Sequence, residues 1–145
     1  MSEKEESVGP TFRPSRAGLG KVLGDLEAAV MEYVWQASEP VTARVVAENV
    51  GEQRGVQYIT VITVLNNLWR KKLLSRRKSG RALKYRPRME RDEFLRQVSR
   101  DVFSGMMDLG PQMAVNSFID VLAELAPGEI ERLKRKLAKK RRTEM

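Results

Sequence analysis

The chain has 145 residues, 41% of them hydrophobic and 32% charged, which suits one domain or a small domain with an appendage. It contains no cysteine and no histidine, so disulfides, thiolate or imidazole metal sites and histidine-based acid–base chemistry are excluded, and no cofactor or metal is expected. The formal net charge of +8 favours an anionic partner, either nucleic acid or an acidic membrane surface.

Residues 1–21 mix charge with Gly, Pro and Ser and show little periodicity, so we expect a flexible N-terminal arm. Arg13 and Arg16 would let this arm reach a minor groove or a phosphate, although a simple untethered tail is favoured. The acidic, polar first residues are no secretory signal, and no apolar run in the chain approaches the about 18 residues of a membrane span. We therefore expect a cytoplasmic protein that does not bind membranes.

A first core helix is expected to begin near Asp25, a favourable N-cap residue, and to end before Pro40. Its apolar residues recur at helical spacing and are Leu26, Val30, Tyr33, Val34 and Ala37. Thr42 is expected to cap a short second helix over residues 43–49, which is followed by a loop bracketed by glycines.

Residues 56–72 predict a third helix with two contrasting faces. At about 100° per residue, one face gathers Tyr58, Val61, Val64, Leu65, Leu68 and Trp69, which would pack on the first helix. The opposite face has hydroxyls, amides and cations but no carboxylate, and it gathers Thr60, Thr63, Asn67, Arg70 and Lys71. Such groups bond to phosphates and base edges, so this helix is interpreted as one that lies in a DNA major groove; a solvated face is the alternative.

After Lys72 the pattern becomes strand-like. Residues 73–77 and 82–86 are expected to form a hairpin in which Gly80 supplies the positive φ of a tight turn and Pro87 ends the second strand. This segment carries six cations and no carboxylate, namely Arg76, Arg77, Lys78, Arg81, Lys84 and Arg86. The composition favours a wing that holds the DNA backbone over an ordinary solvated hairpin.

Residues 89–138 predict three amphipathic helices, broken at Gly105 and Gly110 and restarted by prolines. Helices of this length bury one apolar face poorly alone, so we expect a dimerisation module; folding back on the first domain is the alternative. The dimer contacts would come from Phe94, Leu95, Val98, Val102, Val115, Phe118, Ile119, Leu122 and Leu133. Residues 139–145 indicate a basic, solvated tail.

These elements predict a mainly α protein with a small β-hairpin wing. Residues 22–88 would form a winged helix-turn-helix domain, and residues 89–138 a helical dimerisation domain. The side chains expected at DNA are Thr42, Arg44, Gln57, Tyr58, Ile59, Thr60, Thr63, Asn66, Asn67, Arg70, Lys71, Lys78 and Arg81.

The order of parts resembles the penicillinase repressors and methicillin-resistance repressors, a family of dimeric winged-helix transcription regulators. The resemblance runs from about residue 23 to residue 137 and is carried by L-G-D-L-E-A-A-V-M-E-Y-V-W, Y-I-T-V-I-T-V-L-N-N-L, K-K-L-L-S-R, S-G-R-A-L-K-Y-R-P, V-N-S-F-I and L-A-P-G-E-I-E-R-L-K-R-K-L. It implies that Thr60 and Thr63 contact DNA. The chain departs from its relatives at Ile59, Ile62, Asn67 and Lys72.

The resemblance also implies a mode of release. Relatives are cut within the dimerisation helices after a membrane sensor detects a β-lactam, and the equivalent bond here is Ser117–Phe118. The Asn that precedes the cut in relatives is displaced by one residue, to Asn116. The absence of cysteine argues against the route of a related copper-responsive branch.

The sequence is thus interpreted as a sequence-specific, DNA-binding transcriptional regulator, with a homodimeric repressor favoured. Its expected partners are a roughly palindromic double-stranded operator, a second copy of the chain and, indirectly, a membrane sensor-protease of a β-lactam or cell-envelope stress response. The alternative is a non-specific nucleoid-associated or RNA-binding basic protein. A helical protein–protein adaptor is a further alternative, and no enzymatic activity is expected because a carboxylate pair in a cleft is not indicated.

Overall fold

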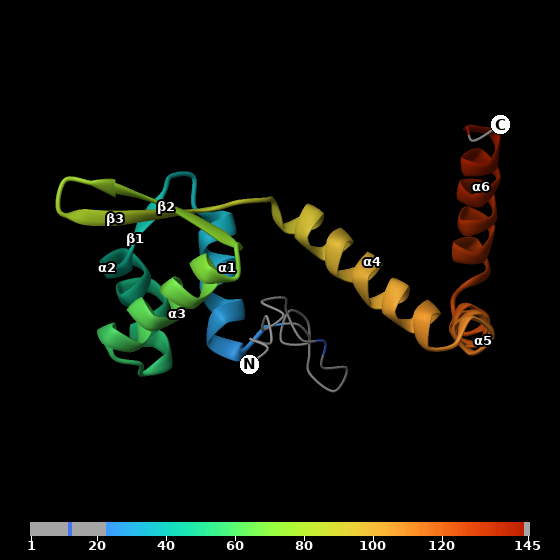
Figure 1. The fold of residues 1–145 in the computed structure, drawn as a ribbon, viewed down its shortest axis with the longest axis horizontal. Helices are drawn as coiled ribbons and strands as arrows, with labels where there is room; N and C mark the ends of the chain where they lie inside the picture. Colours follow the sequence, from blue (N-terminus) through green and yellow to red (C-terminus); the bar gives the residue numbers. More distant parts are fainter. Residues whose placement is uncertain (1–11, 13–22, 144–145) are drawn as a thin grey trace, which may run out of the picture. The chain divides into compact units, whose positions relative to one another are not determined.

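The structure is a computed structural model in which residue 12 and residues 23–143 are described (Figure 1). The arm predicted over residues 1–21 lies outside the described residues, apart from Phe12. The elements in chain order are α1 (Asp25–Gln36), β1 (Val41–Thr42), α2 (Ala43–Val46), a π-helical turn (Ala47–Gly51), a 3-10 turn (Glu52–Arg54), α3 (Tyr58–Arg70), β2 (Leu74–Ser79), β3 (Ala82–Pro87), α4 (Arg91–Leu109), α5 (Pro111–Ala123) and α6 (Pro127–Thr143). Packing divides the chain within α4 into two compact units, one ending at Ser99 and the other beginning at Arg100.

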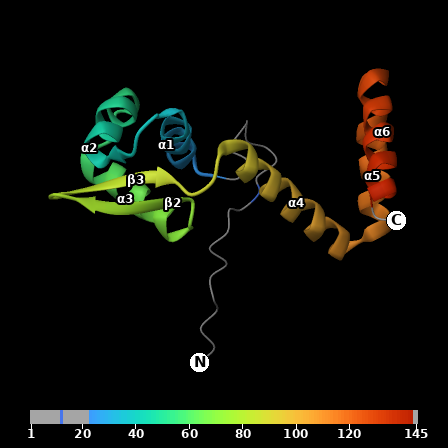
Figure 2. The same cartoon turned by 90° about the horizontal axis from the view of Figure 1, so that it is seen from above.

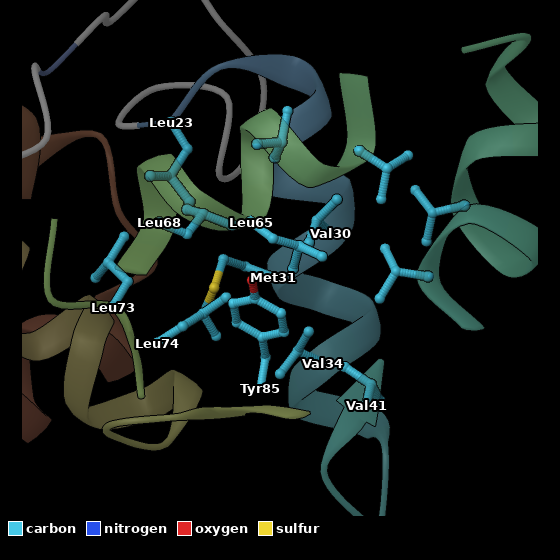
Figure 3. Packing of buried hydrophobic residues seen from close by; sticks show 14 of the residues in the cluster. Leu23, Val30, Met31, Val34, Val41, Leu65, Leu68, Leu73, Leu74 and Tyr85 are labelled. Carbon is cyan, nitrogen blue, oxygen red and sulfur yellow. The ribbon is translucent and has the colours of Figure 1, made fainter. Parts of the chain in front are cut away.

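The core of the first unit lies between α1, α3 and the sheet (Figure 3). Its largest fully buried side chains come from these elements, from α2 and from the residue Leu23 before α1, and are Leu23, Met31, Leu65, Leu68, Leu74, Val30, Val34, Val46 and Val61. Burying one such side chain stabilises the fold by roughly 1.5–3 kcal/mol, so the apolar stripes of α1 and α3 hold the domain together. One detail of the prediction was wrong, because the N-cap of α1 is Gly24 and Asp25 is its first helical residue.

The second helix begins as predicted, since the hydroxyl of Thr42 accepts a hydrogen bond of 3.2 Å from the backbone N–H of Val45. It differs at its end: α2 continues through the π-helical and 3-10 turns and stops at Gly55, whose φ is 65°. Gly51 is buried where this segment meets α3, and a Cβ there would lie 3.1 Å from Cγ2 of Val61. The close approach of the two helices therefore depends on a residue without a side chain.

The wing is one part of a three-stranded antiparallel sheet with the order β1-β3-β2. The predicted hairpin is confirmed, and Gly80 has the expected positive φ of 62°. Its strands are displaced from the predicted bounds, with Leu74 opposite Pro87 and Ser79 opposite Ala82. The sequence missed β1, in which Val41 pairs with Tyr85, because two residues are too few to show alternation. Both views show the hairpin tip projecting beyond α2 and α3 (Figures 1 and 2).

The second unit contains the rest of α4 together with α5 and α6. The predicted break at Gly105 was wrong, because α4 is continuous from Arg91 to Leu109. Pro111 occupies the first turn of α5 as predicted, and the rings of Phe103 and Phe118 meet edge to face at 5.7 Å. The predicted basic tail is helical as far as Thr143, and its cations in the last turn complement the negative end of the helix dipole. Among the described helices, none is long and apolar enough to cross a membrane.

Candidate nucleic-acid interface

Helix α3 turns one face to its own core and leaves the other free. Val61, Val64, Leu65 and Leu68 are buried, as the periodicity predicted. Ile59 is 62% exposed, Thr63 and Arg70 are also exposed, and Thr60 and Asn67 are half-buried. The helix has no Asp or Glu anywhere between Tyr58 and Arg70, so nothing on it repels a phosphate.

Two aromatic residues lie on the exposed side, against their predicted place in the packing face. Tyr58, the first residue of α3, is 52% exposed, and Trp69, next to its last residue, is 39% exposed. Tyr58 is therefore accessible to a ligand, in keeping with its place among the predicted DNA contacts.

The start of α2, the start of α3 and the wing surround one open depression of about 860 Å³. Four predicted DNA-binding residues from these three elements line it together, namely Thr42, Arg44, Tyr58 and Arg81. Gln57 is exposed at the N-cap of α3. Glu48 and Glu52 also line the depression, and the Glu48 carboxylate lies 4.0 Å from the Arg44 guanidinium. The lining cations are Arg44, which lies beside Glu48 on the α2 side, and Arg81 on the wing side.

The hydroxyl of Thr63 donates a hydrogen bond of 3.0 Å to the backbone carbonyl of Ile59. The proton of the hydroxyl is thus directed back along the helix, and Thr63 as a whole is exposed. In this state Thr63 offers an acceptor and a methyl contact to a ligand rather than a donor.

Two residues predicted to contact DNA have partners inside the domain in this structure, and their contact with DNA stays a prediction. The amide oxygen of Asn66 accepts hydrogen bonds from the Arg76 guanidinium at 3.0 Å and from the Tyr85 hydroxyl at 3.2 Å. The ammonium of Lys71 lies 2.8 Å from the carboxylate of Glu27 on α1. Because 100° spacing describes only one helix, it cannot reveal partners that the sheet and α1 provide.

The cations of the hairpin divide into three groups. The Arg76 guanidinium lies 3.6 Å from the centroid of the Trp69 ring and holds the wing against α3. Lys78 and Arg81 are exposed near the turn, as expected of backbone contacts. Arg77, Lys84 and Arg86 line a separate depression. The alternation of residues after Leu74 predicts this division, because successive side chains of a strand point to opposite faces.

The predicted dimerisation residues also divide. Phe94 is 2% exposed and packs at 5.5 Å against the Trp35 ring, so it belongs to the core of the first unit and the prediction was wrong for it. Leu95 and Val98 are half-buried against the same core. In the second unit, Val115, Phe118 and Ile119 are exposed and Val102, Leu122 and Leu133 are half-buried. Ser117 is exposed within α5.

The chain matches the family model described as penicillinase repressor over residues 23–139. It belongs to the penicillinase repressor family. The transcriptional regulator BlaI of Mycobacterium tuberculosis is 35% identical to this family member over 116 residues, which are 80% of this chain and 83% of the relative. The family consists of transcriptional repressors rather than enzymes, so this member is a DNA-binding repressor, and the predicted winged-helix fold is confirmed.

Two solved structures with similarity to this repressor are those of BlaI and MepR. The solution structure of the DNA-binding domain of the repressor BlaI is 26% identical, covers 48% of this chain and 83% of that one, and has a TM-score of 0.44. The crystal structure of MepR, a transcription regulator of the Staphylococcus aureus multidrug efflux pump MepA, is 18% identical, covers 83% and 79% of the two chains, and has a TM-score of 0.39.

Proposed function

We propose that this repressor acts as a homodimer on a roughly palindromic operator, with α3 of each subunit in a major groove. The observation that carries the proposal is the exposed, acid-free face of α3, where Ile59, Thr63 and Arg70 are accessible. Ile59 is suited to a thymine methyl and Arg70 to a phosphate or a guanine edge. Lys78 and Arg81 would hold the backbone from the projecting wing.

The apolar surface of the second unit supports self-association. Large hydrophobic side chains are exposed along α4, α5 and α6 and in the turn between α5 and α6, namely Phe103, Met106, Met107, Leu109, Met113, Val115, Phe118, Ile119, Val121, Leu125 and Leu137. Exposed apolar surface on this scale is typical of an interaction site. A second copy presents the same helices, so a closed two-fold dimer would cover both surfaces and set the spacing of two half-sites.

Release by proteolysis at Ser117–Phe118 is the regulatory part of the proposal, with a membrane sensor for β-lactams or envelope stress acting upstream. This bond lies inside α5 (Pro111–Ala123), where the backbone is held in helical hydrogen bonds. A protease would therefore need to open the helix locally before cleaving it. Cutting there would divide the surface formed by Val115, Phe118 and Ile119 and so weaken the dimer.

Selection of duplexes from a random pool by the purified full-length protein tests the central claim. We expect enrichment of an inverted repeat whose half-site centres are separated by about 10 base pairs or a multiple of that. Recovery of duplexes without a shared motif would contradict it and favour non-specific binding. Competition of the selected duplex with bulk DNA and with RNA measures the same distinction independently, because phosphate contacts alone do not discriminate sequence.

A further inference from the structure

The alternation of the wing strands places three cations on the side of the sheet that faces away from α3. Leu74 and Tyr85 are buried among the core residues, which fixes the inner face (Figure 3). Arg76 lies opposite Tyr85 and so shares this inner face. The intervening pairs Ser75–Arg86 and Arg77–Lys84 therefore form the outer face.

The outer face holds a depression of about 370 Å³, lined by Pro40, Ser75, Arg77, Ser79, Lys84 and Arg86. Arg76 also borders it, although its guanidinium lies over the Trp69 ring. No carboxylate is among these residues, and in the part of the chain that the structure describes no ion pair is formed by Arg77, Lys84 or Arg86. Arg77 and Lys84 lie directly opposite each other on adjacent strands. Like charges in such a pair destabilise a sheet, and a bound anion would remove the repulsion.

We propose that this outer face binds the phosphate backbone of a second DNA duplex, distinct from the duplex whose groove α3 enters. The proposal rests on the proposed function in placing α3 on the first duplex. Because the sheet separates its outer face from α3, a duplex seated on α3 leaves Arg77, Lys84 and Arg86 uncovered. A repressor with both surfaces would bring two segments of DNA together.

The chemistry of the outer face favours DNA over an acidic peptide. Guanidinium groups bind phosphates in a bidentate manner, and the hydroxyls of Ser75 and Ser79 supply further donors. Lys84 and Arg86 are two residues apart on β3, roughly 6.8 Å, which is twice the ~3.4 Å axial spacing of phosphates on one DNA strand. A peptide ligand would need apolar anchors, and among the described residues only Pro40 lines the depression with an apolar side chain.

A bridging assay with the full-length protein tests the inference. The selected duplex is immobilised and saturated with protein, and a labelled duplex of unrelated sequence is then added. We expect wild-type protein to retain the labelled duplex, and the Arg77→Ser, Lys84→Ser, Arg86→Ser variant to lose most of this retention while its affinity for the selected duplex changes less than about threefold. For retention of the labelled duplex, the slope of log K against log salt concentration should become shallower by about 2.7 when three phosphate contacts are lost, at about 0.9 for each contact.

A matched variant distinguishes an effect of the outer face from an effect of lowering the net positive charge. Lys136→Ser, Lys139→Ser and Lys140→Ser remove three exposed cations from α6 and should leave retention unchanged. Equal retention by wild type and the outer-face variant, or an equal loss in both variants, would overturn the inference. Stronger binding of polyglutamate than of duplex to the outer face would also overturn it. If the triple variant does not fold, Lys84→Ser and Arg86→Ser singly should each reduce retention.

The two proposals fail in different ways. Failure of the proposed function appears as selection without an enriched inverted repeat. Failure of the second-duplex inference appears in the bridging assay, with the sequence preference of the protein intact.

Discussion

The guanidinium of Arg76 on β2 lies 3.6 Å from the centroid of the Trp69 ring at the end of α3. The same group donates a hydrogen bond of 3.0 Å to the amide oxygen of Asn66, one turn earlier on that helix. Arg76 therefore fixes the wing relative to the helix that reads DNA, through one stacking contact and one hydrogen bond. Lysine has neither a planar guanidinium nor its fork of donors and cannot replace both.

Arg76→Ala should lower the free energy of unfolding by about 1–2 kcal/mol, since a partly exposed cation–π contact and one hydrogen bond are lost together. Urea denaturation followed by circular dichroism measures this. Arg77→Ala is the matched control, because Arg77 is the next residue, is exposed and should change stability by less than about 0.5 kcal/mol. Equal effects of the two substitutions would show that the stacking contributes nothing.

Gly51→Ala should destabilise the first unit by about 1 kcal/mol or more. The added Cβ would lie 3.1 Å from Cγ2 of Val61, a fully buried β-branched residue whose side chain has little freedom to move. Thermal denaturation should show a lower midpoint.

Gly105→Ala is the control for that experiment. Gly105 lies inside α4 with no atom within 4 Å of an added Cβ. Alanine there should raise stability by about 0.5–1 kcal/mol, because it restricts the unfolded chain and favours the helix. If Gly51→Ala were equally stabilising, the close packing of α3 on the π-helical turn would be ruled out.

Arg70→Ala should weaken DNA binding. The slope of log K against log salt concentration should become shallower by about 0.9, as expected for one lost phosphate contact. Lys71→Ala should leave that slope unchanged, because the ammonium of Lys71 lies 2.8 Å from Glu27 rather than on the free face. Fluorescence anisotropy at several salt concentrations distinguishes the two. A flattened slope for Lys71→Ala would support the original prediction for that residue.

The sequence predicts features that depend on neighbouring residues better than contacts between residues far apart in the chain. The apolar stripe of α3, the cap at Thr42 and the turn at Gly80 follow from local spacing and were predicted. Asn66 and Lys71 were predicted to contact DNA from the spacing along one helix. Their partners in this structure, Arg76 and Glu27, come from other elements, and that spacing does not reveal them.

Phe94 was assigned to the dimer for the same reason. Its helical spacing fits one continuous stripe along α4, yet tertiary packing gives the first turns of that helix to Trp35. Periodicity identifies an apolar face but does not identify what covers it. The sequence analysis likewise did not separate the two faces of the wing sheet. The register of the strands places Arg76 on the inner face and Arg77 on the outer face.

Thr63→Val should reduce discrimination between the selected duplex and random DNA by about 1 kcal/mol, or roughly fivefold, with little effect on affinity for random DNA. Valine keeps the methyl group and removes the hydroxyl oxygen, which is an acceptor once its proton is given to the carbonyl of Ile59. Competition binding measures both affinities. An equal loss on the two kinds of DNA would exclude base reading by this hydroxyl.

Truncation after Ser99 should leave a folded monomer that binds the selected duplex poorly, because the exposed apolar surface of the second unit is removed. Truncation after residue 88 should fold less stably, by about 3–5 kcal/mol, since it also deletes the buried ring of Phe94. It further removes Met89, whose backbone carbonyl accepts a hydrogen bond of 3.0 Å from the indole N–H of Trp35. Chemical denaturation compares the two stabilities and analytical ultracentrifugation the two assemblies. A dimeric protein ending at Ser99 would move the dimer interface into the first unit, and equal stability of the two truncations would remove Phe94 from its core.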